Sequence, residues 1–230
     1  DIVPADRKLY ALRDVTSTVE SIPLICSSIL SKKMAEGIDS LVLDVKCGLG
    51  AFMKTEAEAR QLAESLVAIS TTMGKPTSAI LTRMDEPLGH MIGNSLEVIE
   101  SIDCLKGKGP ADLMEVTYAL CAEMLIIGGI QSSKEGAMTA LKGAIDSGTA
   151  LEGFRALVEA QGGDGAVVDD YNCLPRTEKT KDIVLNNHST MYVEGLDARS
   201  FGDAACILGA GRVSTDSIID PSVGIELLKK

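Results

Sequence analysis

The sequence predicts an α/β protein: a parallel-sheet α/β domain with a small helical domain segment at its N-terminus. Two short apolar runs, 40–45 and 77–82, predict strands, and the β-branched first run is typical of a buried parallel strand. A helical pattern between them supplies the long crossover that parallel strands require. Further helical patterns precede the first run and follow the second, as expected of an α/β chain.

The N-terminal segment predicts helix with a break over 14–21. Ser17 and Glu20 have the spacing of a capping box that would start the second part. Pro23 suits a first helical turn, where its missing N–H costs nothing. Gly37 is expected to end the helix in the left-handed conformation.

The strand at 40–45 runs into a glycine loop, 46–53. Thr55 is then expected to cap a helix, with Glu58 three residues on as its capping-box partner. We expect this helix to continue to Thr72.

The second half of the sequence is mainly helical. Helices are predicted at 94–105, 111–127, 133–146, 150–161 and 201–208. The stretch 161–178 predicts a polar, hinge-like connection. Residues 181–193 predict one or two strands, with a turn at Asn186 and Asn187.

These patterns divide the chain into a helical part, 1–37, an α/β domain, 38–178, and the start of a C-terminal α+β domain, 179–230. The chain begins at Asp1 without a methionine and stops within an apolar run, so we expect both ends to be cut from a longer protein. We see no secretory leader, and no run reaches the roughly 18 apolar residues of a membrane helix.

The charge balance argues against nucleic acid and membrane surfaces as partners. The 230 residues carry 22 Lys and Arg against 33 Asp and Glu, a net charge of -11, which repels phosphate groups on average. Aromatic residues make up only 3%, so platforms for stacked bases are not expected. Six scattered cysteines without a CxxC pair predict reduced thiols in a cytoplasmic protein and no metal site.

Two places near the first strand allow more than one interpretation. The glycine loop follows a strand as a phosphate site would, but it lacks the third glycine of GxGxxG, and a tight turn explains it better. Asp44 and Lys46 form either a buried charge pair or, with Asp44 as the acid, part of a catalytic site.

The acidic residues of 85–100 form either a cation site or a solvated surface.

Arg13, Ser28 and Lys32 are the strongest candidate residues. A guanidinium, a hydroxyl and an ammonium can together hold a flat polar ligand, and Ser28 and Lys32 are four apart on one helix face. Arg13 precedes this helix and has to be brought in by the turn. An ordinary ion pair at Arg13 and a solvated last turn at Lys32 also fit the pattern.

Long stretches of the chain resemble the thymidine phosphorylase and pyrimidine-nucleoside phosphorylase family. The resemblance rests on PADRKLYALRDVT, SIPLI and SKK within 4–33, on LDVK at 43–46, Gly48 and GAFM at 50–53, and on LGAGR at 208–212; Cys47 and Leu49 depart from the family pattern. It covers nearly the whole chain and is weakest over 111–178.

The resemblance implies a homodimer that catalyses reversible phosphorolysis of thymidine or uridine in nucleotide salvage. The products are the free base and (deoxy)ribose 1-phosphate; phosphate is a co-substrate and no cofactor is implied. Arg13, Ser28 and Lys32 fall on the positions that bind the pyrimidine base. The walls of the base pocket fall on Tyr10, Val19, Ile25 and Phe52.

The resemblance also places the phosphate-binding residues before Asp1, so none is expected here and the chain alone is expected to be inactive. In the potassium-binding branch of the family, cation ligands fall on Leu88, Met91 and Glu100. The choice between thymidine and uridine stays open. A catalytically silent fragment or paralogue serving as a dimeric binding module is the alternative, and a related phosphoribosyltransferase ranks below it.

Overall fold

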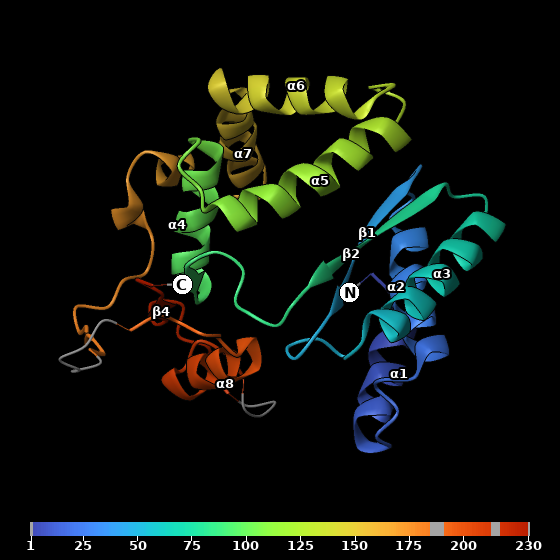
Figure 1. Ribbon diagram of the computed structural model, residues 1–230, viewed down its shortest axis with the longest axis horizontal. Coiled ribbons are helices and arrows are strands. Elements are labelled where there is room, and N and C mark those ends of the chain that lie inside the picture. The colour runs from blue at the N-terminus through green and yellow to red at the C-terminus, as the bar shows by residue number, and fades with distance from the viewer. Residues whose placement is uncertain (1, 185–190, 213–216, 230) are drawn as a thin grey trace. The chain divides into compact units, whose positions relative to one another are not determined.

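The computed structural model describes residues 2–184, 191–212 and 217–229 (Figure 1). The chain divides into two compact units. The first unit comprises Asp1–Met84 and Tyr118–Met138, and the second comprises Asp85–Thr117 and Thr139–Lys230. The predicted division at residues 37 and 178 stays a prediction.

In the first unit, β1 (Leu41–Cys47) and β2 (Thr77–Arg83) pair in parallel, with Leu41 opposite Thr77. The helix α3 (Glu56–Thr72) connects them. The predicted strand–helix–strand unit and the α/β class are therefore confirmed.

The predicted cap of α3 is confirmed as well. The side chain of Thr55 accepts a hydrogen bond from the backbone N–H of Glu58 at 3.3 Å, and the carboxylate of Glu58 accepts one from the N–H of Thr55 at 3.0 Å. This reciprocal pair satisfies two N–H groups that the first helical turn leaves without partners.

Two helices precede the strands: α1 (Pro4–Val15) and α2 (Ile22–Ala35). The break between them is confirmed, but the predicted capping box is wrong, because α2 begins after Ser21 rather than after Ser17. Ser17 has a positive φ of 55° and lies within the turn. Pro23 occupies the first turn of α2, as expected.

One apolar core holds α2, α3 and the strands together. Its buried side chains include Ile25 and Leu30 from α2, Val45 from β1, and Leu62 and Leu66 from α3. Figure 1 shows α3 running alongside the strand pair, with α2 beside α3. Because α2 buries this side against α3, its position is set by packing, and its other side is left for polar contacts.

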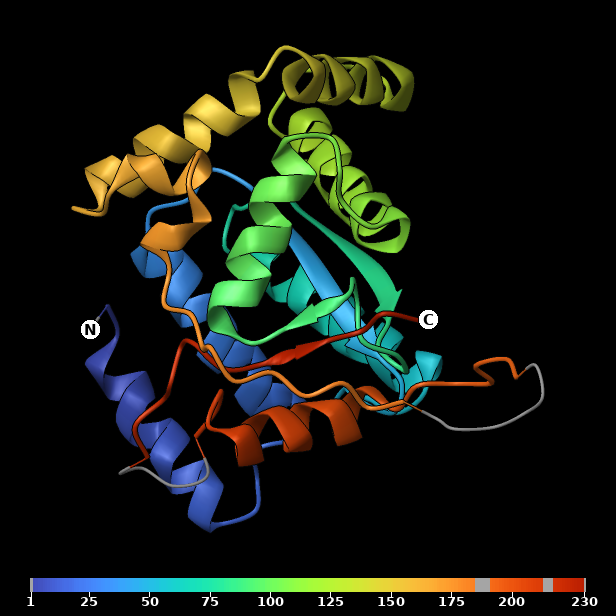
Figure 2. The same cartoon turned by 90° about the vertical axis from the view of Figure 1, so that its left-hand side faces the viewer.

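The second unit contains a short antiparallel pair that the sequence did not predict. The strands β3 (Met91–Ile92) and β4 (Ile225–Glu226) are each two residues long. Figure 2 shows the pair with α4 (Asn94–Leu105) on one side and α8 (Ala198–Leu208) on the other. Strands this short show no alternating pattern that could be recognised.

The predicted helices of the second half are present. They are α4 and α8, together with α5 (Ala111–Ile127), α6 (Lys134–Asp146) and α7 (Thr149–Ala160). α8 starts three residues before its predicted start, because the carboxylate of Asp197 caps the N–H groups of Arg199 and Ser200. No helix in the described part of the chain is long and apolar enough to cross a membrane.

The hinge-like connection predicted for 161–178 is wrong. Two short 3-10 helices, η1 (Gly165–Val168) and η2 (Tyr171–Cys173), lie there, and Val167 and Val168 are buried with Ile102 of α4. Two adjacent valines have no helical or alternating spacing, so the sequence pattern could not predict this core contact.

Polar contacts tie the same segment to α4. The hydroxyl of Tyr171 donates to the carboxylate of Asp103 at 2.6 Å and accepts from the ammonium of Lys106 at 3.1 Å. We call Asp103, Tyr171 and Lys106 the ring cluster. It helps to fix the segment that the sequence predicted to be a hinge.

The strands predicted at 181–193 are wrong over the part that the structure describes. Residues 181–184 and 191–193 have no regular secondary structure. The predicted turn at Asn186 and Asn187 lies outside the described residues.

Candidate functional site

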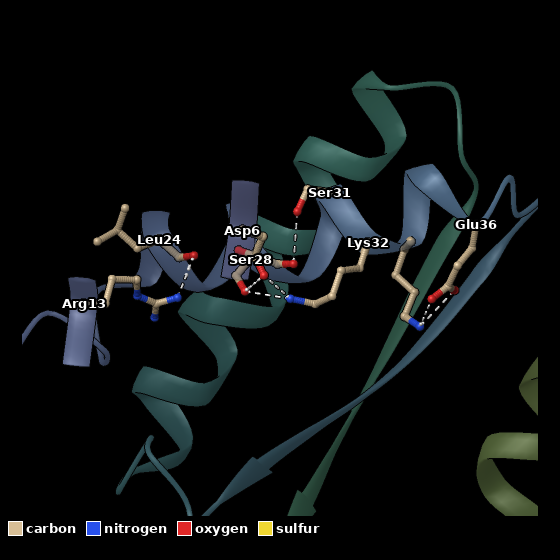
Figure 3. A network of polar contacts seen from close by, with 8 residues as sticks. Asp6, Arg13, Leu24, Ser28, Ser31, Lys32 and Glu36 are labelled. Atoms are coloured by element: carbon tan, nitrogen blue, oxygen red, sulfur yellow. Dashed lines mark hydrogen bonds and ion pairs between the residues drawn. The ribbon is translucent and has the colours of Figure 1, made fainter. Parts of the chain in front are cut away.

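The helices α1 and α2 form a hairpin whose facing sides carry the candidate residues. Asp6, near the start of α1, contacts Ser28 in the middle of α2 and Lys32 in its last turn, as Figure 3 shows. Arg13, near the end of α1, contacts Leu24 in the first turn of α2. The two helices therefore run in opposite directions. Asp6 and Arg13 are seven residues apart on α1, and the partners of Asp6 lie four and eight residues after Leu24, the partner of Arg13, on α2.

Asp6, Ser28 and Lys32 form a closed network, which we call the hairpin cluster. The hydroxyl of Ser28 donates to Oδ2 of Asp6 at 3.0 Å, and Nζ of Lys32 donates to the same oxygen at 2.5 Å. Nζ of Lys32 also donates to Oγ of Ser28 at 2.9 Å. The prediction that Ser28 and Lys32 share one face is confirmed.

The cluster differs in exposure from end to end. Ser28 is only 6% exposed, and the side chain of Asp6 is 15% exposed. The side chain of Lys32 is 42% exposed. The buried groups are therefore shielded from competing water, while the ammonium is the most exposed part of the cluster.

The pKa of the Asp6 carboxyl is lowered from its usual value. The main cause is the hydrogen bond from Lys32, followed by the hydrogen bond from Ser28 and by the charges of Lys32 and Arg13; partial burial acts in the opposite direction. Asp6 is therefore a carboxylate at neutral pH. A carboxylate only accepts hydrogen bonds, so Ser28 and Lys32 must both be donors to it.

Arg13 is buried, with 6% of its surface exposed, and it holds the turn between the helices. Its guanidinium donates to the carbonyl of Leu24 at 3.2 Å, to the carbonyl of Val19, and at 3.5 Å to the carbonyl of Thr18. It also lies over the ring of Tyr10, 5.0 Å from the ring centre. A guanidinium has five N–H groups, and these three contacts use one at each nitrogen.

The predicted pocket-wall residues lie in three different settings. Tyr10 and Val19 are beside Arg13 through the contacts just described. Ile25 faces the apolar core of the first unit. Phe52 stands in the glycine loop and is 58% exposed.

The glycine loop is better explained as a tight turn than as a phosphate site. The backbone N–H groups of Gly48, Gly50 and Ala51 donate to the carbonyls of Met53, Met84 and Gly48, respectively. A phosphate cradle would need such N–H groups to point at the ligand. Gly48 also has a φ of 118°, which favours glycine.

Asp44 and Lys46 form the predicted charge pair, with 2.6 Å between Oδ2 and Nζ. The pair is not buried, because both side chains retain a quarter to a third of their exposure. The hydroxyl of Thr82 completes it, donating to Asp44 and accepting from Lys46 at 2.9 Å.

In the second unit, Glu100 is buried against the loop that the resemblance associates with potassium. Its Oε1 accepts from the N–H of His90 at 2.7 Å, and a side chain at Gly89 would collide with its carboxylate. Leu88 and Met91 flank these residues. A carboxylate has the oxygen donors that hard cations take, but among the described residues no contact of Glu100 with the carbonyls of Leu88 or Met91 is seen, so the potassium site stays a prediction.

Asp6 is the residue that the sequence analysis missed. It lies seven residues before Arg13, so helical spacing alone places the two on one side of α1. Its role depends on the hairpin, however, because its partners Ser28 and Lys32 lie on another helix. That pairing is a tertiary contact without a local signal.

Comparison with known proteins agrees with the residue-level resemblance. Residues 2–151 match the family described as glycosyl transferase family, a/b domain, and residues 192–230 match the pyrimidine nucleoside phosphorylase C-terminal domain. Over all 230 residues, the chain is 49% identical to the pyrimidine-nucleoside phosphorylase of Geobacillus stearothermophilus and 46% identical to that of Bacillus subtilis. It covers 53% of each, so it spans about half the length of the curated relatives it matches.

The family match covers well over half of the chain and includes the helical hairpin and the β1–β2 pair. The predicted resemblance to pyrimidine-nucleoside phosphorylases is thereby confirmed. The chain belongs to the glycosyl transferase family defined by this a/b domain.

Proposed function

We propose that the full-length protein containing this chain is a pyrimidine-nucleoside phosphorylase. It would convert thymidine or uridine and phosphate into the free base and the (deoxy)ribose 1-phosphate. The observation that carries this proposal is the hairpin cluster. Ser28 and Lys32 fall on the base-binding positions of the family and lie 2.9 Å apart, with the ammonium exposed.

The proposed reaction places negative charge on the departing base. An oxygen of phosphate bonds to C1′ of the sugar as the bond from C1′ to N1 of the base breaks, and the electron pair of that bond stays with the base. The charge spreads onto the ring carbonyl oxygens. An ammonium aimed at such an oxygen binds the transition state more strongly than the substrate.

Each candidate residue has a role that follows from its donors. Lys32 supplies a point charge to a ring carbonyl, and Ser28 meets the ring N3–H. Arg13 orders the turn that carries Val19 and offers its remaining N–H groups to the base. We place no phosphate-binding residue in this chain and require no cofactor.

The wider biology is proposed on the same footing. We infer a homodimer that serves pyrimidine salvage, because the resemblance implies it, and a cytoplasmic location, because the scattered cysteines are typical of reduced thiols. The net charge of -11 disfavours nucleic acid and anionic membranes as partners. A potassium ion near Leu88, Met91 and Glu100 would be structural, distant in sequence from the base-binding residues.

The test is phosphate-dependent release of thymine from thymidine by the full-length protein. Lys32→Ala is expected to lower kcat/KM about 100-fold or more, because one charged donor to the developing anion is lost. The neighbouring Lys33, paired with Glu36 at 3.1 Å, provides the matched control, and Lys33→Ala should stay within about twofold of wild type.

Equal loss in both lysine variants would contradict the assignment of the site. A wild-type protein that binds thymine but releases none from thymidine in the presence of phosphate would instead favour the binding-module alternative. Running uridine beside thymidine decides the substrate preference.

A further inference from the structure

Asp6 leaves the hydroxyl of Ser28 only one way to meet a ligand. A serine hydroxyl has one hydrogen and two acceptor lone pairs. Its hydrogen is donated to Asp6 at 3.0 Å, and one lone pair accepts from Lys32 at 2.9 Å. What remains is a single lone pair, so Ser28 can only accept from a further partner.

Lys32 has the complementary property. An ammonium has three N–H groups and no acceptor. One N–H goes to Asp6 and one to Ser28, which leaves the third as a donor. The hairpin cluster therefore presents one donor beside one acceptor.

This arrangement matches the edge of a cyclic imide, where a ring N–H lies next to a ring carbonyl. Uracil and thymine have such an edge, because N3 carries a hydrogen between two carbonyl groups. In cytosine, N3 carries no hydrogen and is itself an acceptor. Its lone pair would face the lone pair of Ser28, and both would be left without a hydrogen.

We propose that Asp6 is a specificity-determining positioning residue, which holds the hydrogen of Ser28 so that the site accepts a ring N–H and rejects a ring nitrogen without one. The inference rests on the proposed function, because it takes Ser28 and Lys32 to face the base. Asp6 acts through Ser28 and does not itself touch the ligand.

Burial and charge favour this role over a freely rotating hydroxyl. Ser28 is 6% exposed, so water cannot easily turn its hydrogen away from Asp6. The lowered pKa of Asp6 keeps the carboxyl ionised at neutral pH, and an ionised carboxylate cannot reverse the bond by donating. The simpler role, a brace between α1 and α2, predicts no discrimination between bases.

The experiment measures dissociation constants of free uracil and free cytosine, by calorimetry, for the full-length protein. The variants are Asp6→Asn, Ser28→Ala and the double variant. Asp103→Asn is the matched control, because it removes a carboxylate that also accepts from a hydroxyl, but in the ring cluster. Thermal unfolding of each variant shows that it is folded.

Wild type should bind uracil more tightly than cytosine, and Asp6→Asn should reduce that preference about tenfold, while Asp103→Asn leaves it unchanged. In the Ser28→Ala background, Asp6→Asn should have no further effect on the preference, because it acts through the hydroxyl. Asp6→Glu keeps the charge but moves the oxygens, so its preference should fall between wild type and Asp6→Asn. It serves as the test should Asp6→Asn fail to fold.

Two results would overturn the inference. One is an Asp6 variant that weakens both bases equally, which is the behaviour of a brace. The other is a wild-type protein without preference for uracil. Both results come from binding measurements and do not depend on turnover. Failure of the proposed function would instead show as no phosphate-dependent release of base, so the two failures are distinguishable.

Discussion

The hairpin cluster and the ring cluster contain the same three kinds of group. Each has a carboxylate, a hydroxyl and a lysine ammonium, and in each the hydroxyl donates to the carboxylate and accepts from the ammonium. The chemical inventory alone therefore does not separate a binding site from a structural contact. The two clusters differ in where the ammonium lies.

In the ring cluster, Lys106 lies over the aromatic ring of Tyr171, 4.6 Å from its centre. Burial, the hydrogen bond to Asp103 and the charge of Asp103 raise the pKa of the Tyr171 hydroxyl. The cation is thus packed against its own partner. In the hairpin cluster, the partner hydroxyl belongs to a small side chain and the ammonium of Lys32 stays accessible. An accessible charge held by buried partners is what a binding site needs.

The largest effect on stability is expected from Arg13→Ala. The substitution removes the donor to the carbonyls of Thr18 and Val19, in the turn between α1 and α2, and to that of Leu24, in the first turn of α2. This should lower the free energy of unfolding by about 3 kcal/mol. Lys32→Ala should lower it far less, because the Lys32 side chain is partly exposed. Urea denaturation measures both.

Arg13→Lys sharpens this prediction, since it keeps the charge but loses the planar fork. We expect a stability between wild type and Arg13→Ala. If Arg13→Ala proves as stable as wild type, Arg13 is not the brace that its burial indicates.

Removing the hydroxyl of each cluster should separate their roles. Ser28→Ala is expected to lower kcat/KM for thymidine about tenfold, through loss of one hydrogen bond to the base. Tyr171→Phe should leave kcat/KM within about twofold and lower the free energy of unfolding by about 1 kcal/mol. Steady-state kinetics and denaturation on the same preparations give both quantities, and the reverse pattern would exchange the roles of the two clusters.

The ring cluster should also control stability at high pH. The pKa of Tyr171 is raised by folding, so its contribution is complete below the unfolded value near 10 and is lost as the pH rises above it. The stability advantage of wild type over Tyr171→Phe should therefore shrink between about pH 10 and 11. An advantage that is constant to pH 11 would contradict this assignment.

The hairpin cluster should act at the acid side, with the opposite sign. The pKa of Asp6 is lowered by folding, so its contribution is complete above the unfolded value of 3.8 and is lost as the pH falls through the folded value. The advantage of wild type over Asp6→Asn should be full at pH 6 and smaller at about pH 3. This is the smallest effect, and melting temperatures across that range measure it.

The two clusters also show which features the sequence predicts. Thr55 and Glu58 form a capping box that is local to one helix turn, and it was predicted correctly. Ser17 and Glu20 have the same spacing, but Ser17 adopts a positive φ within the turn, so spacing misled there. Local patterns hold only where the surrounding chain permits the backbone conformation they need.

The contacts that define the site lie beyond such patterns. Ser28 and Lys32 are four apart on one helix and were predicted together, whereas Asp6, on α1, was not. Tyr171 reaches α4 across 68 residues of sequence, and nothing local marks it as a partner of Asp103. The family resemblance singled out the hairpin residues, and the structure supplied the partner that orients them.

The most direct test removes the lysine of each cluster in turn and compares the two variants. Phosphate-dependent release of thymine from thymidine is measured for the full-length wild type, Lys32→Ala and Lys106→Ala. We predict that Lys32→Ala loses about 100-fold or more in kcat/KM, while Lys106→Ala stays within about threefold of wild type. Equal rates in the two variants would contradict the claim that the hairpin cluster, and not the ring cluster, binds the pyrimidine base.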